Sequence, residues 1–600
     1  MKNNPDNYRG IILLSCVGKL FTALLTQRLT DYLDAIGGIG DEQAGFRHEF
    51  STADHIFTLN AIINIYLSKG KQLYCAFIDY RKAFDFVDRA SLWSKMLSLG
   101  INGNLLRVIH NMYDYAKSCV LNEGTLSDYF SCNVGVRQGE NLSPMLFAIY
   151  LNDFEYSISK RYKGLEFLAN EISNYLSDDD VEYFLKIFAL LYADDTIVLA
   201  ETADQLQLAL NAVYDYCKEW DLTVNTSKTK IVIFSKKKFN DYPAFLFGHD
   251  IVEVVEDYTY LGVIFNYNGS FYKAINKQVE QGKRAFYALL HKIKILRLPV
   301  DLALELFDSL VVPVLLYGCE TWGYSDSNQI ETLHRKFIKT ILGIHLSTPN
   351  CMVYGESGRY PLTNSIKSRM INYFSKLING NRKKLSYMMC QLLKKMQATE
   401  ASFISPWADY LRDEMGRLGM LDIWIGHGLG FNCEYIKNSI KLRLGDMFQQ
   451  IWHNEVQEHN YCDFYKDIKN EWGIESYLIE MNYKQRQILT KWRCRSNYLP
   501  ISTSRFYPNE DFTCPLCRTD SIGNEVHYLL SCPFFSQKRQ NLSESEPNLL
   551  NIFHFKNKIW LSKLSSFLDI ILRVFEHRKE WDRDLNDSSI LFESDEDDDV

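Results

Sequence analysis

Residues 188–200 read Phe-Ala-Leu-Leu-Tyr-Ala-Asp-Asp-Thr-Ile-Val-Leu-Ala, so two apolar runs flank the adjacent carboxylates Asp194 and Asp195. This pattern predicts a β-hairpin whose tight turn projects both acids out of a buried sheet. An Asp-Asp pair by itself is equally consistent with a surface turn. A second apolar run, residues 73–78, also ends in an acid, Asp79. Two strand ends that both present aspartates indicate one Mg²⁺ site, because hard cations prefer carboxylate oxygens.

The composition is that of an ordinary globular chain, and only local basic stretches bear on nucleic-acid binding. The 600 residues suffice for several domains, and 46% hydrophobic and 23% charged residues are typical of folded proteins. The net charge of −8 does not by itself indicate a nucleic-acid binder, and residues 593–599 are strongly acidic. Basic stretches could face a polyanion or simply be solvated helix faces. They are residues 228–238, 273–297, 335–339, 367–395 and 484–495.

The cysteines and the hydropathy pattern bear on the compartment. Fourteen cysteines without a signal peptide point to a reducing environment. No uninterrupted apolar stretch reaches the length that a membrane span needs. We therefore expect a soluble protein of the nucleus and cytoplasm.

Hydrophobic periodicity predicts alternating strands and helices in the first third of the chain and helices afterwards. Expected helices are 17–33, 51–67, 89–99, 145–158 and 206–220. Expected strands are 73–79, 229–235 and 258–265, the last closed by a hairpin turn at 266–269. Ser143 as N-cap and Pro144 at the first position are expected to start the fourth helix, and Asp85 to cap the turn into the third. The fold class is α+β followed by all-α.

Seven short motifs in one order resemble those of a known family. They are Asn7-Tyr-Arg-Gly-Ile, Gln43-Ala-Gly-Phe-Arg-His, Phe77-Ile-Asp with Ala83-Phe-Asp, Gly135-Val-Arg-Gln-Gly with Leu142-Ser-Pro, Tyr192-Ala-Asp-Asp, Asn225-Thr-Ser-Lys-Thr-Lys and Tyr260-Leu-Gly. Over residues 5–345 the chain resembles the reverse transcriptase of non-LTR (LINE-type) retrotransposons. The resemblance implies an α+β right-hand polymerase with partial fingers, palm and helical thumb. A mostly α-helical C-terminal region with a small zinc knuckle would follow.

The resemblance also implies roles for particular residues. Asp79 and Asp194 would be the principal ligands of two catalytic Mg²⁺ ions, with Asp195 as the supporting carboxylate. Phe84 matches the steric gate beneath the incoming sugar, although core packing is an alternative role for this ring. Arg9 matches the arginine that grips the triphosphate through its planar fork.

The resemblance implies roles for further residues in the other motifs. Arg137, Gln138 and Gly139 match the loop that packs against the template and the nascent base pair, where glycine permits close backbone approach. Lys228 matches the lysine that protonates the leaving pyrophosphate, with Lys230 as its competitor. The remaining matches are Tyr260–Gly262 as primer grip and residues 273–297 as the thumb helix that follows the duplex.

A second constellation lies near the C-terminus. Cys514-Pro-Leu-Cys517, then His527 after nine residues and Cys532 after four more, have the spacing of a tetrahedral structural Zn²⁺ site. It resembles the C-terminal knuckle of LINE-type proteins. Upstream cations are expected to form an RNA-binding face. They are Lys484, Arg486, Lys491, Arg493 and Arg495.

We therefore expect an RNA-directed DNA polymerase that acts on an RNA template, a DNA primer or target and dNTPs. The expected parts are fingers and palm (1–270), thumb (271–345), a helical connector (346–510), the knuckle (511–535) and an amphipathic helix with an acidic tail (536–600). The finger motif and endonuclease that such elements encode upstream are missing, so an N-terminally truncated copy is expected. The main alternative is a catalytically silent nucleic-acid-binding remnant or domesticated factor. A maturase or telomerase-like polymerase is a third interpretation.

Overall fold

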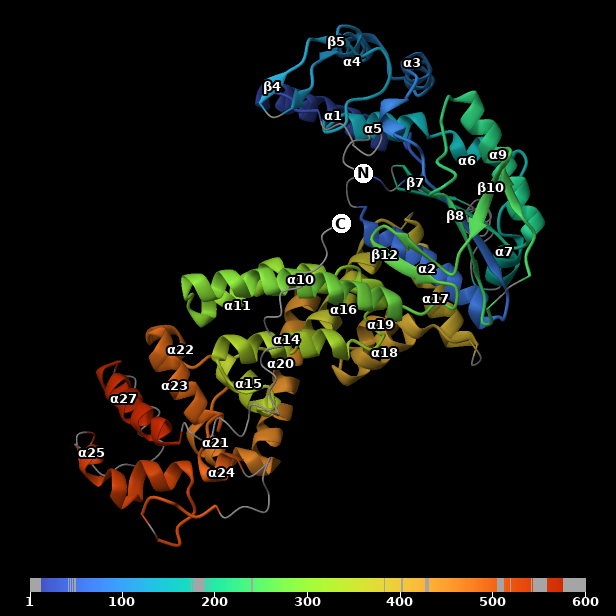
Figure 1. Cartoon of the computed structure of the whole chain (residues 1–600). Coiled ribbons are helices and arrows are strands. Elements are labelled where there is room, and N and C mark those ends of the chain that lie inside the picture. The colour runs from blue at the N-terminus through green and yellow to red at the C-terminus, as the bar shows by residue number, and fades with distance from the viewer. Residues whose placement is uncertain are drawn as a thin grey trace. The chain divides into compact units, whose positions relative to one another are not determined.

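The computed structural model divides into two compact units (Figure 1). The first contains residues 1–274, 318–326 and 369–436, and the second contains 275–317, 327–368 and 437–600. The structure describes residues 12–40, 43, 45, 47, 50–122, 124–173, 175, 189–192, 194–238, 241–382, 384–400, 403–426, 431–503, 512–517, 519–540, 542 and 558–575.

A six-stranded sheet organises the first unit, with strand order β6-β7-β1-β8-β10-β9. The strands are β1 (Leu73–Ile78), β6 (Ala189–Tyr192), β7 (Asp195–Ala200), β8 (Lys230–Phe234), β9 (Phe245–Phe247) and β10 (Asp250–Val254). All neighbours are antiparallel except the pair β8 and β10. The predicted hairpin around the two aspartates is confirmed as β6 and β7.

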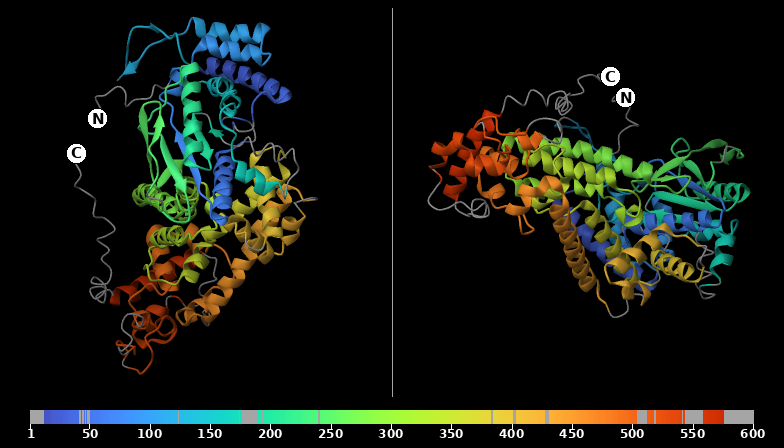
Figure 2. Two further views of the ribbon diagram at one scale, coloured as in Figure 1. Left: turned by 90° about the vertical axis from the view of Figure 1, so that its right-hand side faces the viewer. Right: turned by 90° about the horizontal axis from the view of Figure 1, so that it is seen from below.

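The two faces of β1 pack against different partners because successive side chains of a strand point to opposite sides. Tyr74, Ala76 and Ile78 belong to the core that also contains apolar residues of α5 and α9. Helix α9 (Ala203–Glu219) covers this face of the sheet (Figure 2). On the other face, the ring of Phe77 stacks on that of Tyr258 at 4.4 Å. The strand is buried on both sides, which explains its uninterrupted apolar sequence.

The other helices of the first unit were predicted in part. Besides α9 they are α1 (Cys16–Ile36), α2 (Thr52–Ser68), α3 (Arg89–Ser98), α4 (Gly103–Asp114), α5 (Ser143–Tyr150), α6 (Phe154–Ser159), α7 (Glu166–Ile172), α13 (Cys319–Trp322), α17 (Leu385–Thr399), α18 (Pro406–Arg417) and α19 (Leu421–Ile425), with the turn η2 (Ala83–Asp85). Helix α16 (Leu362–Asn379) and helix α20 (Cys433–Glu458) each include residues of both units. Helix α4 and the small ribbons β2 (Lys117–Ser118), β3 (Leu121–Asn122), β4 (Thr125–Leu126) and β5 (Phe130–Ser131) were not predicted.

Two predicted helix starts were wrong in detail. The N-cap of α5 is Leu142 rather than Ser143, and the expected helix over 145–158 is interrupted between α5 and α6. The cap of α3 is Asp88 rather than Asp85, because the Asp88 carboxylate accepts a hydrogen bond of 2.7 Å from the amide of Ser91. Asp85 lies instead in the preceding turn η2.

The strand predicted at 258–265 is a hairpin. It consists of β11 (Asp257–Tyr260) and β12 (Val263–Asn266), joined at Leu261 and Gly262. Both turn residues have positive φ, 45° and 83°. A leucine rarely adopts that conformation, so the turn has no Asn-Gly signal in the sequence. The turn predicted at 266–269 exists, with the amide of Gly269 donating to the carbonyl of Asn266 at 2.8 Å.

The second unit is helical in its described residues. Its helices are α10 (Tyr272–Leu296), α11 (Val300–Leu310), α12 (Val312–Leu315), α14 (Asn328–Leu342), α15 (Asn350–Ser357), α21 (Asp463–Ile468), α22 (Tyr477–Glu480), α23 (Tyr483–Arg493), α24 (Pro500–Thr503), α25 (Ser536–Gln540) and α27 (Lys558–Val574). Short helical turns are η3 (Asn460–Cys462), η4 (His527–Ser531) and η5 (Pro533–Phe535). Aromatic stacking contributes to its core, with Phe307 at 4.2 Å from Phe337. The predicted basic helix over 273–297 is confirmed as α10.

A fully buried ion pair lies in this core. The guanidinium of Arg493 contacts both carboxylate oxygens of Glu356 at 2.9–3.1 Å and that of Glu475 at 3.2 Å. The hydroxyl of Tyr477 donates to Glu356 at 2.6 Å. These contacts satisfy charges that would be costly to bury alone.

Replacing Arg493 by methionine is expected to lower the free energy of unfolding of this unit by about 3–5 kcal/mol, because Glu356 would remain buried without its cation. Urea unfolding followed by tryptophan fluorescence measures the change. The control is Arg573→Met, which removes an exposed i,i+4 partner of Asp569 and should cost less than about 1 kcal/mol. Equal losses in the two variants would contradict the expectation.

Candidate active site and metal centre

Strand register brings the three predicted aspartates to one edge of the sheet. Ile78 pairs with Thr196, so Asp79 leaves β1 beside the first residue of β7, Asp195. Asp195 pairs in turn with Tyr192 across the two-residue turn that contains Asp194. All three aspartates are half-buried. Two strand ends and a hairpin turn therefore place Asp79, Asp194 and Asp195 at one edge of the sheet, which we call the carboxylate edge.

The backbone around Asp79 is held by the segment that precedes β8. The amide of Asp79 donates to the hydroxyl of Thr229 at 3.2 Å, and its carbonyl accepts from the amide of Asn225 at 2.7 Å. The Asp79 carboxylate lies 4.0 Å from the ammonium of Lys228, whose side chain is 62% exposed. The ammonium of Lys230 points elsewhere, to Glu253 at 2.8 Å. Of the two lysines between which the sequence did not decide, Lys228 lies beside Asp79 and Lys230 lies beside Glu253.

The pKa of the Tyr258 hydroxyl is affected by the negative charge of the nearby aspartates. Burial raises the pKa of Tyr258 to about 12, and the carboxylates of Asp195 and Asp79 contribute in the same direction. Nearby negative charge disfavours the phenolate, so the phenol stays protonated at neutral pH. Tyr258 therefore lies within electrostatic reach of acids from both strand ends.

Phe84 stands on the turn η2 after β1. Its ring stacks on Phe147 of α5 at 4.8 Å and remains half-buried. The carbonyl of Phe84 accepts from the amide of Val136 at 2.7 Å, which ties the turn to the glycine-bearing loop. Gly135 of that loop has φ +79°, and a Cβ there would lie 2.5 Å from the carbonyl oxygen of Asp85. Only glycine permits this close approach.

In the loop that precedes α5, the arginine side chain contacts other residues of the protein. The guanidinium of Arg137 donates to the carbonyl of Met112 at 2.5 Å and lies over the ring of Tyr113. Glu140 is buried and accepts a hydrogen bond of 2.8 Å from the hydroxyl of Tyr113. Tyr113 and Glu140 thus organise the loop, and sequence reasoning missed both.

The other two loop residues are placed differently. The carbonyl of Gln138 accepts from the amide of Ile12 at 3.0 Å, and Gly139 is exposed with φ 100°. Arg9 lies outside the described residues. The predicted primer grip, Tyr260–Gly262, forms the end of β11 and the turn to β12.

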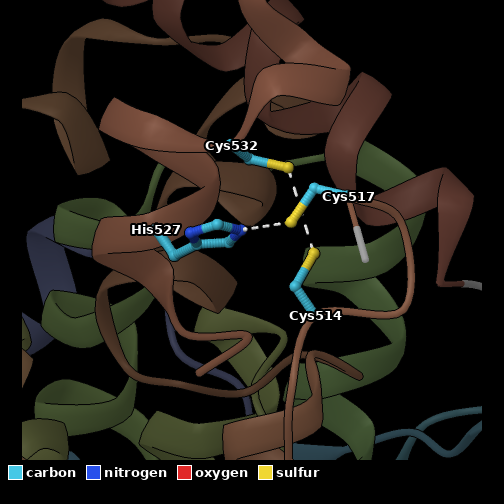
Figure 3. Close-up of side chains that lie close together, drawn as sticks. All are labelled: Cys514, Cys517, His527 and Cys532. Carbon is cyan, nitrogen blue, oxygen red and sulfur yellow. Dashed lines mark hydrogen bonds between the residues drawn. The ribbon is translucent and has the colours of Figure 1, made fainter. Parts of the chain in front are cut away.

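The cysteine–histidine group is assembled as predicted (Figure 3). The ligand atoms of Cys514, Cys517, His527 and Cys532 all lie within 4.8 Å of one another. Within the described residues it is the one group of three or more His, Cys, Asp or Glu that meets this limit. Burial lowers the pKa of His527, which favours the neutral imidazole that binds a metal. Three thiols and one imidazole fit Zn²⁺.

The arginines predicted to form an RNA-binding face beside this centre are internal, which corrects that prediction. Arg493 is paired with Glu356 in the core, and Arg495 is paired with buried Glu525 at 3.1 Å. Arg486 is 6% exposed and donates to the carbonyl of Leu298 at 2.6 Å. The cause is long-range pairing, which a local cluster of basic residues does not reveal.

Comparison with known proteins identifies the class to which the sheet-containing part of the chain is related. Residues 1–265 match the family model for reverse transcriptase (RNA-dependent DNA polymerase). Within that class, the reverse transcriptases of non-LTR retrotransposons are distant homologues of this chain over about half of its length. The predicted family is confirmed.

Individual relatives are about a quarter identical to the chain over the aligned residues. The RNA-directed DNA polymerase from mobile element jockey of Drosophila funebris is 24% identical over 354 residues, covering 56% of this chain and 36% of the relative. The probable RNA-directed DNA polymerase from transposon X-element of Drosophila melanogaster is 24% identical over 396 residues, covering 63% and 40%. The Pol polyprotein of a type-1 R2 element of Popillia japonica is 24% identical over 364 residues, covering 58% and 47%. The chain thus spans less than half the length of these relatives.

Among solved structures, apo telomerase from Candida tropicalis aligns with 70% of this chain and 61% of its own, with a TM-score of 0.30 and 13% identity.

Within the described part of the chain, no helix has the length and apolarity needed to cross a bilayer.

Proposed function

We propose that the chain is the RNA-directed DNA polymerase of a non-LTR retrotransposon and adds dNTPs to a primer 3′-hydroxyl under the direction of an RNA template. The observation that carries the proposal is the convergence of Asp79, Asp194 and Asp195 at one sheet edge, within the residues that match the family. In cells, the reaction would be target-primed copying of element RNA in the nucleus, after synthesis of the protein in the cytoplasm.

The three carboxylates would hold two Mg²⁺ ions, which activate the primer hydroxyl and neutralise the leaving pyrophosphate when bound. The oxygens of Asp79, Asp194 and Asp195 are the hard ligands that such ions require. Phe84 would exclude a ribose 2′-hydroxyl, while Arg9 and the loop at Gln138 and Gly139 would orient the nucleotide. Lys228 would donate a proton to the departing pyrophosphate. Zn²⁺ on the cysteine–histidine group would have a structural role.

Primer extension tests the proposal directly. The purified chain is given poly(rA)/oligo(dT), Mg²⁺ and dTTP, with Asp194→Ala as the control. We expect incorporation by the wild-type chain and none by the variant. RNA binding without incorporation by either protein would support the alternative, a catalytically silent nucleic-acid-binding remnant.

Replacing Phe84 by valine is expected to reduce discrimination against ribonucleotides at least about tenfold, since a smaller side chain leaves room for the 2′-hydroxyl. Competitive extension with dTTP and UTP measures the ratio. The matched control is Phe86→Val, because Phe86 follows on the same turn and is 47% exposed. An unchanged ratio for Phe84→Val would assign the ring to packing against Phe147.

Replacing Lys228 by alanine is expected to lower the single-turnover rate about 10²-fold, the usual contribution of a general acid. The Lys230→Ala variant should keep its rate, because the Lys230 ammonium is bound to Glu253 and to the carbonyl of Ser227. Rapid-quench measurement on a saturated primer–template distinguishes the two. A slow Lys230→Ala variant together with an unaffected Lys228→Ala variant would assign the general-acid role to Lys230.

A further inference from the structure

A buried histidine connects the two hairpins of the candidate active site. His55 lies on α2 and is 4% exposed. Its Nδ1 is 3.2 Å from the hydroxyl of Tyr260, the last residue of β11. Its ring meets the ring of Tyr192 edge-on, with centroids 6.0 Å apart and planes at 73°. Tyr192 ends β6, directly before the turn that carries Asp194.

The contact depends on shape and hydrogen bonding rather than on charge. Burial lowers the pKa of His55 to about 3, so the imidazole is neutral at any pH used for polymerase assays. Burial raises the pKa of Tyr260, and the carboxylate of Asp195 adds to that shift, so the phenol stays protonated. A neutral ring and a neutral hydroxyl can share one hydrogen bond in either tautomer of the histidine.

Helix α2 is itself firmly held, which makes it a suitable support. The carboxylate of Asp54 accepts hydrogen bonds from the hydroxyls of Tyr373 at 3.0 Å and Ser386 at 3.3 Å. The ring of Phe57 packs on that of Trp407 at 4.6 Å. Residues of α16, α17 and α18 therefore hold α2 in place within the same unit (Figure 1).

We propose that His55 is a positioning residue of the polymerase site: it holds the turn bearing Asp194 in a fixed relation to the β11–β12 hairpin. The inference rests on the proposed function for its catalytic consequence. If β11–β12 presents the primer end, a shift between the hairpins moves the primer 3′-hydroxyl relative to the carboxylates. A displacement of about 1 Å in such a geometry can cost about 10²-fold in rate.

The test uses side chains that keep or remove the Nδ1 contact. His55→Asn places a polar amide atom near the position of Nδ1, His55→Gln places it near Nε2, and His55→Phe keeps a ring without either nitrogen. Tyr260→Phe removes the partner hydroxyl. The readouts are kcat and KM for dTTP on poly(rA)/oligo(dT), and hydrogen exchange of residues 189–200 and 257–266.

We expect His55→Phe and Tyr260→Phe each to lower kcat about 10- to 100-fold with little change in KM, and to speed exchange in both hairpins. His55→Asn should recover most of the loss and His55→Gln should not. The double variant should be no slower than the worse single variant, because both changes remove one contact.

Additive losses, equal behaviour of Asn and Gln, or exchange that rises equally throughout the unit would overturn the inference and leave His55 as a general packing residue. The hydrogen-exchange readout does not depend on activity. If the wild-type chain fails to incorporate dTTP, the proposed function fails. The hydrogen exchange of residues 189–200 and 257–266 in the His55 variants would still show whether His55 holds the two hairpins together.

Discussion

Replacing Asp79 by asparagine is expected to lower the rate of primer extension at least about 10³-fold, equivalent to about 4 kcal/mol of transition-state stabilisation. The substitution preserves side-chain size and removes one negative charge from the carboxylate edge. The backbone contacts of this position, to Thr229 and Asn225, involve its amide and carbonyl and remain available. The fold should therefore persist while the charge that would bind Mg²⁺ is lost. Single-turnover extension with saturating dTTP measures the rate.

The matched control is Asp85→Asn, because Asp85 is an exposed aspartate six residues further along the same segment. It lies in the turn η2 and does not belong to the carboxylate edge, so the rate should stay near that of the wild type. Circular dichroism and thermal unfolding of both variants show whether the fold is kept. Comparable rate losses, or an active Asp79→Asn, would remove Asp79 from the catalytic set.

The carboxylate edge could be predicted because its causes are local. Each apolar run is long enough for one buried strand, and each ends at an acid, so strand ends and charges coincide in the sequence. In the structure β1 and β7 are paired neighbours, which brings their acids to the same edge of the sheet. The cysteine–histidine group is equally local, since all four ligands lie within nineteen residues of sequence, 514–532.

Features that depend on distant partners could not be predicted. The internal position of Arg493 follows from Glu356, which lies 137 residues earlier in the chain. The hairpin turn holds Leu261 at φ 45°, against the intrinsic preference of leucine, so the local sequence does not indicate it. In both cases the local sequence favours the wrong answer, an exposed cation or a continuous strand.

Residues 369–436 show how a segment without recognisable motifs can still serve the site. The sequence assigned them to a connector of unknown role. The structure packs α16, α17 and α18 against α2, through Tyr373, Ser386 and Trp407 respectively. Since α2 carries His55, we expect changes in this segment to reach the carboxylate edge through this helix.

Removing zinc from the C-terminal module is expected to unfold residues 512–542 locally. Structural Zn²⁺ sites contribute binding free energies on the order of 10 kcal/mol, which a segment this short cannot replace by its own core. The module is anchored through Glu525, which accepts hydrogen bonds from Arg495 and Ser502, both at 3.1 Å. Its loss should therefore also loosen residues 495–503. Cys532→Ser should abolish bound zinc in elemental analysis and speed hydrogen exchange across both segments.

The control for the zinc experiment is Cys16→Ser, because Cys16 is an exposed free cysteine on α1 outside the metal group. This variant should bind one zinc ion per chain, as the wild type should. Treating the wild type with a strong chelator should reproduce the exchange pattern of Cys532→Ser, and adding zinc back should restore protection only in the wild type. Retention of zinc by Cys532→Ser, or unchanged exchange after chelation, would show that the four ligands do not form the structural centre. Primer extension by the same samples then tells whether incorporation needs the metal centre.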